Sequence, residues 1–247
     1  MPAVSRRHIF GKWVPEISPY CGPLYFSNSL ESPLGVSASG SFGLVDTGRR
    51  KLLVTCRHVW DGFQPLRDKD PALKIFVCLQ QGNPVVLTQS PIALGDDLDI
   101  ATFDMDPLLP ACRGNKFFRL DHNPPRNLTQ KNYLFFLGYP GCWRSSTSEA
   151  IQFGRVPYAT SVSSVDGFRF RADISKAVYE DDNPRPPEQR HGGISGSPCF
   201  YLRRANVPLK LVEMATSFTF GQLGFVHLQC LNADGTIKTS PPQTRVP

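Results

Sequence analysis

The sequence lacks several features that would place it in common functional classes. No apolar stretch approaches the length of a membrane span, and residues 1–20 contain no apolar segment typical of a secretory signal. No Cys-x-x-Cys pair indicates zinc, and seven cysteines without a close pair are typical of reduced thiols. The net charge of +6 is not gathered into a dense basic run. We therefore expect a cytoplasmic protein without a metal site, and with neither a membrane nor a nucleic-acid partner.

The composition favours an all-β fold made of short strands. Glycine (20) and proline (23) are spread over 247 residues, which suits tight turns and argues against long helices. Only a short helix is expected, near 59–63. Short apolar or β-branched runs predict strands, and they lie at 40–45, 51–59, 73–79, 84–88, 100–103, 132–137, 151–159, 167–172, 198–202, 209–218 and 224–231.

Proline-rich stretches divide this pattern into two groups of strands. Residues 1–33 are interrupted by prolines and are expected to be irregular, and 237–247 form a Pro-rich tail. The polar stretch at 121–131 is interpreted as a connection between a first β-barrel at 34–121 and a second at 122–236. A single large sandwich would fit the same periodicity.

A serine between glycines is the most informative chemical feature. Ser195 lies in the stretch His-Gly-Gly-Ile-Ser-Gly-Ser-Pro, which a strand follows. Glycine adopts backbone angles that other residues resist, so such a turn can direct several N–H groups at one point. Acyl transfer needs such donors near its nucleophile, and the N–H groups of Gly193 and Ser195 are the candidates. Taken alone, the stretch is equally typical of an ordinary turn before a strand.

Two other segments supply the groups that such a serine needs. His58 ends an apolar strand, where a lone histidine is more often a core or surface residue than a catalytic base. Asp99 begins another apolar strand, and a carboxylate placed there needs a partner because an unpaired buried charge is costly. The three residues together are more specific than any one of them.

The segments around these residues resemble the chymotrypsin/trypsin-like serine peptidases, in particular their compact bacterial-type members. Residues 55–59 are similar to the family's Thr-Ala-Ala-His block, 99–101 to its Asp-Ile-Ala block, and 193–198 to its Gly-Asp-Ser-Gly-Gly-Pro block. Residues 136–141 are similar to the turn that opens the second barrel. The order His, Asp, Ser is also the family's order. The resemblance extends over roughly 34–236.

The resemblance implies two six-stranded antiparallel β-barrels with the active site in the cleft between them. It also implies a serine endopeptidase that hydrolyses protein or peptide substrates through an acyl-enzyme, without a cofactor. Ser195 would be the nucleophile, His58 the general base and Asp99 the residue that orients the histidine. The N–H groups of Gly193 and Ser195 would form the oxyanion hole.

The sequence departs from the family's pattern next to the serine. Ile194 replaces an aspartate that pairs, in trypsin-like zymogens, with a newly cut N-terminus. We therefore expect an oxyanion hole that is preformed or controlled in another way. Ser197 replaces the family's second glycine. Asp96 and Asp97 compete with Asp99 as the orienting acid, and Asp99 is preferred because the Ile-Ala pair follows it directly.

The substrate pocket follows only from the resemblance. It implicates Gln189 and His191 before the serine, and Thr216, Ser217 and Phe218 on a strand about twenty residues after it. The pocket-floor candidate, Gln189, is not a carboxylate, so a preference for Lys or Arg is not supported.

Other functional classes fit less well. An α/β-hydrolase would need an acid and then a histidine after Ser195, and Glu213 and His227 lie too close together for that fold. A cysteine peptidase would need its thiol at position 195, whereas Cys199 lies within the next strand. A catalytically silent, protease-like barrel that serves as a protein-binding module is the alternative. The N-terminal segment 1–33, the loop at 180–189 or a regulatory protein partner could restrain the enzyme.

Overall fold

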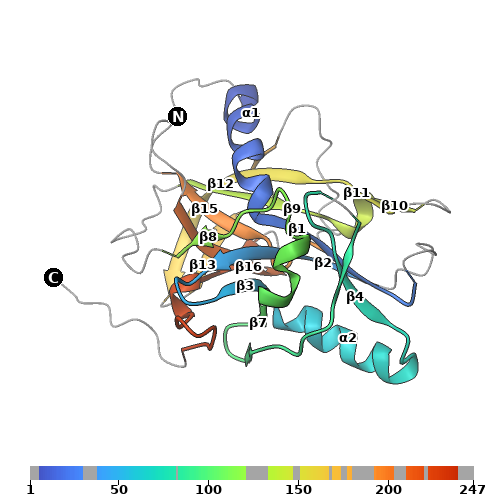
Figure 1. Ribbon diagram of the computed structural model, residues 1–247. Coiled ribbons are helices and arrows are strands. Elements are labelled where there is room, and N and C mark those ends of the chain that lie inside the picture. Colours follow the sequence, from blue (N-terminus) through green and yellow to red (C-terminus); the bar gives the residue numbers. More distant parts are fainter. Residues whose placement is uncertain are drawn as a thin grey trace.

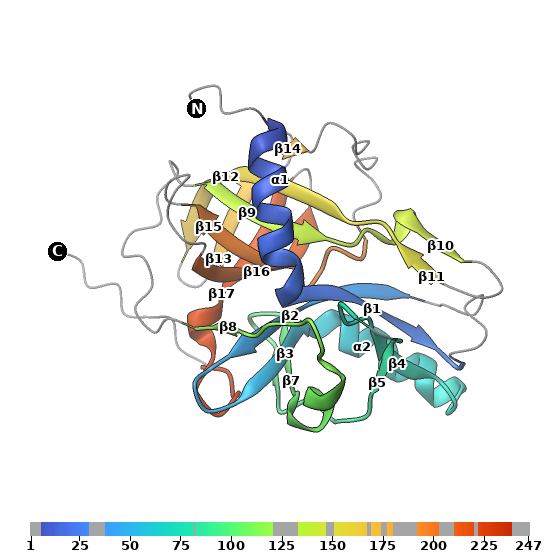
Figure 2. The same ribbon diagram turned by 45° about the horizontal axis from the view of Figure 1, so that its top comes forward.

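The chain folds into two curled β-sheets that lie one above the other, with helix α1 across their junction (Figures 1 and 2). The computed structural model describes residues 6–29, 38–81, 83–120, 133–146, 151–166, 169–173, 177–179, 192–202, 210–219 and 222–238. The first sheet comes from the N-terminal part of the chain and the second from the C-terminal part. The expected connection at 121–131 and the loop at 180–189 lie outside the described residues.

The first sheet has eight strands in the order β5-β4-β1-β2-β3-β7-β6, and β8 pairs with β2. Its elements are β1 (Cys21–Ser27), β2 (Ser39–Asp46), β3 (Lys51–Cys56), β4 (Lys74–Val77), β5 (Val85–Leu87), β6 (Ala93–Gly95), β7 (Ile100–Asp104) and β8 (Phe118–Arg119). The β2–β8 pair is parallel, and the other pairs of this sheet are antiparallel. The turn after Asp46 joins β2 to β3 as a hairpin.

The second sheet closes into a ring of six strands, β13-β17-β16-β15-β9-β12, because β12 pairs with both β9 and β13. Its elements are β9 (Tyr133–Gly138), β12 (Val156–Asp166), β13 (Arg169–Asp173), β14 (Val178–Tyr179), β15 (Pro198–Leu202), β16 (Lys210–Thr219) and β17 (Gln222–His227). A separate hairpin of β10 (Arg144–Ser146) and β11 (Ile151–Phe153) projects beside it. The expected double-barrel architecture is confirmed, with short extra strands in both sheets.

The expectation that residues 1–33 are irregular is wrong. They contain helix α1 (Arg6–Ile17) and strand β1. Phe10, Trp13, Val14 and Ile17 recur at the spacing of one helical face, and all four are buried. Burial of this face outweighs the cost of Pro15 inside the helix, so the prolines did not break it.

The second helix is longer than expected and begins earlier. Helix α2 (Arg57–Lys69) follows β3 directly, so the strand predicted over 51–59 ends at Cys56. Its buried side chains, Val59 and Phe63, lie four residues apart on one face. Within the described part of the chain, neither helix is long and apolar enough to cross a membrane.

The junction of the two sheets is an apolar core of its own. It combines the buried face of α1 with side chains from both sheets, such as Val54 from β3 and Phe135 from β9. The rings of Phe10 and Phe135 lie 5.6 Å apart. Each sheet also encloses a separate core. Because the junction is packed continuously, the loops that meet across it are held in fixed positions.

The second sheet buries a histidine whose titration affects stability. His227 is 8% exposed, lies beside the ring of Phe170, and accepts a hydrogen bond at Nδ1 from the Gln229 amide. Burial, with a smaller effect of Lys238, lowers the pKa of His227 from 6.5 to about 4. As the pH falls, His227 is therefore protonated near pH 6.5 in the unfolded chain but only near pH 4 in the folded chain.

We expect the free energy of unfolding to fall as the pH falls from 6.5 to 4. The loss attributable to His227 is about 2 kcal/mol by pH 5 and about 3 kcal/mol by pH 4. Urea unfolding of the parent and of His227→Gln, at pH 7.5, 6 and 5, measures it. The free energy of unfolding should fall more steeply with decreasing pH in the parent than in His227→Gln. An equal fall in both proteins would show that His227 is not the group responsible.

Candidate active site

Asp99 directly precedes strand β7 and lies against the first turn of helix α2, where it binds two backbone amides of the helix. Its φ of 54° is left-handed, a conformation that aspartate tolerates better than most residues. Its carbonyl accepts from the Arg57 N–H at 3.1 Å, and its Oδ1 accepts from the His58 N–H at 2.9 Å. The first N–H groups of a helix lack partners within it, so Asp99 satisfies two of them. This contact fixes the carboxylate beside the second residue of the helix.

The same carboxylate holds the ring of His58. Asp99 Oδ2 lies 2.7 Å from His58 Nδ1, so one carboxylate binds both the main chain and the ring of the histidine. With the Nδ1 proton directed at the carboxylate, Nε2 is the acceptor. The His58 side chain is 51% exposed and the Asp99 side chain 31% exposed, which leaves the ring accessible from solvent. The pair has the geometry of a general base and its orienting acid.

The two competing acids face other partners. Asp96 pairs with Arg57, which also binds Asp61 through Nε at 3.0 Å. The backbone carbonyl of Asp97 accepts a hydrogen bond from the Arg169 guanidinium of the second sheet. These contacts hold the turn before β7 against helix α2 and against the second sheet. Asp99 is the acid of this turn that contacts His58.

Ser195 lies in a tight turn at residues 192–196, named here the Ser195 turn. Gly193 and Gly196 have φ values of 98° and 93°, which side chains resist. A Cβ at Gly193 would lie 2.6 Å from the Tyr139 carbonyl oxygen. A Cβ at Gly196 would overlap the carbonyl oxygen of Ser41. The glycines are therefore required by both conformation and close approach.

Contacts across the junction place the Ser195 turn against the strand that leads to the histidine. The Ser195 carbonyl accepts from the Ser41 N–H of β2 at 2.8 Å, and the Gly196 amide binds the thiol of Cys56 at the end of β3. The Ser195 side chain is partly exposed. The structure thus brings the Ser195 turn to the end of β3, the strand that precedes His58 in the chain.

The thiol of Cys56 lies close to the side chains of His58 and Asp99. One ligand atom each from Cys56, His58 and Asp99 lie within 4.8 Å of one another, which is close enough to be considered for a metal. Burial, and then the charge of Asp99, raise the pKa of the Cys56 thiol well above its usual value. The thiol therefore keeps its proton at neutral pH and is neither a ready metal ligand nor a nucleophile.

The amides expected to form the oxyanion hole have fixed directions. The Gly141 N–H donates to the Gly192 carbonyl at 2.7 Å, and the Ser197 N–H donates to the Ile194 carbonyl at 2.9 Å. A trans peptide places its C=O and N–H on opposite sides. The N–H of Gly193 therefore points away from Gly141, and the serine's own amide points away from the Ser197 N–H.

Ile194 occupies an apolar site where the family has a charge. It is 1% exposed, packs against Gly138 and belongs to the core of the second sheet. No charged partner can be accommodated there without a large desolvation cost. The turn is thus anchored by apolar packing.

The predicted pocket residues are only partly described. Gln189 and His191 lie outside the described residues. Thr216, Ser217 and Phe218 lie on β16, where their side chains are not described, and the register with β17 shifts at Thr216. Cys199 lies on β15 and is fully buried, as expected for a strand residue that takes no part in the chemistry.

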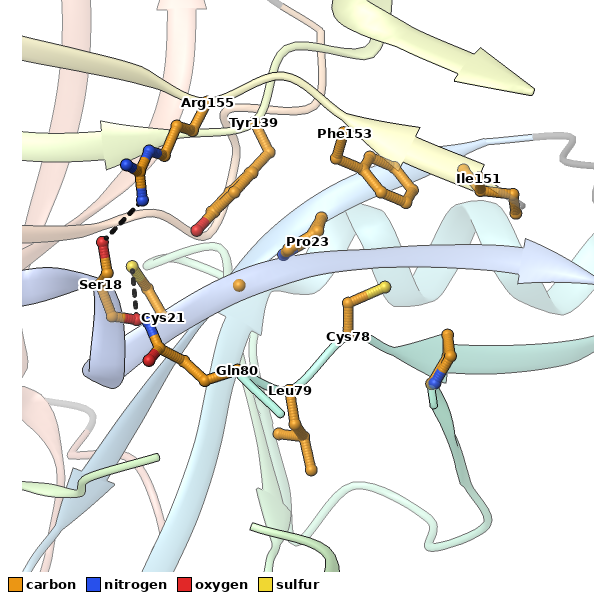
Figure 3. A pocket seen from close by; sticks show the side chains of 12 residues that line it. Ser18, Cys21, Pro23, Cys78, Leu79, Gln80, Tyr139, Ile151, Phe153 and Arg155 are labelled. Carbon is orange, nitrogen blue, oxygen red and sulfur yellow. Dashed lines mark hydrogen bonds between the residues drawn. The ribbon is translucent and has the colours of Figure 1, made fainter. Parts of the chain in front are cut away.

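A cavity of about 330 Å³ has a lining that includes none of His58, Asp99 and Ser195 (Figure 3). It opens beside the start of β1 and the hairpin β10–β11, and sequence reasoning did not find it. The Arg155 guanidinium donates to Ser18 Oγ at 3.3 Å at one end, and Phe153 forms part of the wall. Burial raises the pKa of Cys21 to about 12 and that of Tyr139 well above its usual value, so both groups are neutral.

Solved structures share this fold. No protein-family model matches the chain, and no curated protein matches its sequence. The chain is 12% identical to Deg5 over 91% of each chain, with a TM-score of 0.51. It is 13% identical to a serine protease of human pathogenic astrovirus, over 88% of this chain and 93% of that one, with a TM-score of 0.46. It is also 13% identical to the thermostable serine protease AL20 from an extremophilic microorganism, over 85% of this chain and 91% of that one, with a TM-score of 0.48.

The fold is therefore the double β-barrel of the chymotrypsin-like proteins. The likeness to Deg5 and the two curled sheets carry this conclusion. At such low identity the likeness extends to the fold alone, and the chemistry has to be argued from the residues.

Proposed function

We propose that this protein is a serine endopeptidase in which Ser195, His58 and Asp99 form the catalytic triad. The observation that carries the proposal is the double contact of Asp99 with the backbone and the ring of His58, at 2.9 and 2.7 Å. A carboxylate that only capped the helix would not need the ring. The Ser195 turn contacts Cys56 at the end of β3, shortly before His58 in the chain, and supplies the nucleophile.

The reaction begins at Ser195. Its Oγ attacks the scissile carbonyl carbon while its proton moves to His58 Nε2, and the carbonyl electron pair moves onto oxygen. The N–H groups of Gly193 and Ser195 bind that oxyanion. Asp99 holds the Nδ1 proton and stabilises the imidazolium that forms.

The intermediate then collapses to an acyl-enzyme. The C–N bond breaks, and the leaving amine takes the proton from His58. Water enters, gives a proton to His58 and attacks the ester, after which Ser195 Oγ recovers the proton and the acid product leaves. Every proton transfer uses the same ring, so no metal or organic cofactor is required. Proteins or peptides are the substrates of this proposal.

Labelling with a fluorophosphonate tests the nucleophile without knowledge of the substrate. We expect one adduct per chain, located at Ser195 by mass spectrometry of a digest, and none on Ser195→Ala. Circular dichroism of the variant checks that it is folded. A folded parent that does not react would contradict the proposal and favour the protein-binding module.

A further inference from the structure

We propose that the hydroxyl of Ser41 is a positioning group that holds the Ser195 turn ready for catalysis before substrate binds. Ser41 lies on β2 in the first sheet and is fully buried. Its Oγ donates to the Gly193 carbonyl at 2.6 Å, and its N–H donates to the Ser195 carbonyl at 2.8 Å. The inference rests on the proposed function and explains how its oxyanion hole is kept in shape.

The hydroxyl acts on the one peptide plane that lies between the two oxyanion donors. The planes that carry the N–H groups of Gly193 and Ser195 are each fixed by a main-chain hydrogen bond, as described above. The plane between them carries the Gly193 carbonyl, and the bond to this carbonyl comes from the side chain of Ser41. Glycine allows this plane to rotate at low cost. Rotation would strain the two main-chain hydrogen bonds that set the directions of the donors, and the Ser41 bond opposes it.

The backbone of Ser41 is itself held in place. Thr55 Oγ1 on β3 donates to the Ser41 carbonyl at 2.7 Å, and Thr55 is buried. The bond from Ser41 to Gly193 therefore links the first sheet, whose strand β3 leads directly into the helix that carries His58, to the turn that carries Ser195. A buried carbonyl that lost this donor would have no water to replace it, so the native direction is favoured strongly.

The apolar character of Ile194 makes such a bond necessary. An ion pair cannot anchor the turn at this position, because the side chain packs in the core of the second sheet. The hydrogen bond from Ser41 is present without cleavage of the chain. We infer that the oxyanion hole is formed in the resting protein and that activity requires no new N-terminus.

Ser41→Ala removes the hydroxyl and keeps both backbone groups. We expect the maximal rate of inactivation by a fluorophosphonate to fall roughly 10- to 100-fold, because its phosphoryl oxygen uses the same two donors. The concentration that gives half the maximal rate should change by less than about twofold, since ground-state binding is untouched. Ser41→Gly also removes the hydroxyl and should slow the reaction to a similar extent.

Thr47→Val is the matched control. Thr47 is buried just beyond the end of β2, and its Oγ1 donates to the Ala233 carbonyl at 2.6 Å and accepts from the Arg50 N–H at 3.0 Å. The variant therefore loses at least as much hydrogen bonding as Ser41→Ala, at a place away from the Ser195 turn. It should lose stability as Ser41→Ala does, and keep the parent's inactivation rate. Thermal unfolding of each variant measures that loss.

The outcomes separate this inference from the proposed function. A parent that fails to react would overturn both. A parent that reacts, together with a folded Ser41→Ala or Ser41→Gly that reacts at the same rate, would overturn the positioning role and leave the triad standing. An equal slowing in Thr47→Val would show that lost stability, and not the direction of the donors, limits the rate.

Discussion

Replacing Asp99 by asparagine should lower kcat by about four orders of magnitude while the protein stays folded. An amide still accepts from the His58 N–H through its oxygen, so the start of α2 keeps its partner. At the ring, however, an amide NH₂ would face Nδ1 in place of a carboxylate oxygen. That contact favours the tautomer with its proton on Nε2, and the ring then cannot take the proton of Ser195. Hydrolysis of an activated ester under saturating conditions measures the loss.

Asp97→Asn is the matched control for this change. Asp97 is exposed, lies in the same turn, and contacts the second sheet through its backbone carbonyl, which the substitution leaves intact. Its turnover should stay within about twofold of the parent's, as is typical of an exposed side chain away from the reacting groups. A folded Asp99→Asn with parent turnover would show that Asp99 serves the helix only.

Gly196→Ala should be the most damaging glycine-to-alanine substitution in the part of the chain that the structure describes. The added Cβ would overlap the Ser41 carbonyl oxygen and approach Thr55 Oγ1 at 2.6 Å, and both groups are buried in the strands beneath. The φ of 93° also resists a side chain. Backbone cannot move aside as a flexible side chain can, so we expect a loss of about 4 kcal/mol or more in the free energy of unfolding. Urea unfolding measures it.

Gly62→Ala provides the opposite result from the same substitution. Gly62 lies within α2, and nothing lies within 4 Å of a Cβ added there. Alanine is the better helix former, so this variant should gain about 0.5–1 kcal/mol. Equal effects of the two substitutions would mean that the close approach at Gly196 is not the constraint we describe.

Local chemistry made part of this structure readable from the sequence. The run at 198–202 predicted strand β15 with its observed bounds, and the two glycines around Ser195 predicted a turn that needs positive φ. Phe170 alternates with Arg169 and Arg171 along β13, a pattern that puts the ring and the arginines on opposite faces, and the structure buries Phe170 and exposes the arginines. These features depend on neighbouring residues, so no knowledge of distant segments was needed.

Helix α1 has a local helical pattern that the prolines of this segment mask. The spacing of Phe10, Trp13, Val14 and Ile17 is that of a buried helical face. Pro15 disfavours a helix here, but one proline costs less than the burial of four large side chains contributes. The helix is stable because both sheets supply the surface that it covers, and that surface is formed by residues far along the chain.

The sequence by itself determined the all-β class, the turn around Ser195, and which residue types could perform acyl transfer. Only the tertiary structure decided which aspartate meets His58, and that Ser41 holds the Gly193 carbonyl. Those contacts join residues 41 and 152 positions apart in the chain. Their geometry depends on how two sheets pack around one junction, and a hydrogen bond is made or lost over a few tenths of an ångström. Residue types and spacing along the chain carry no information at that precision.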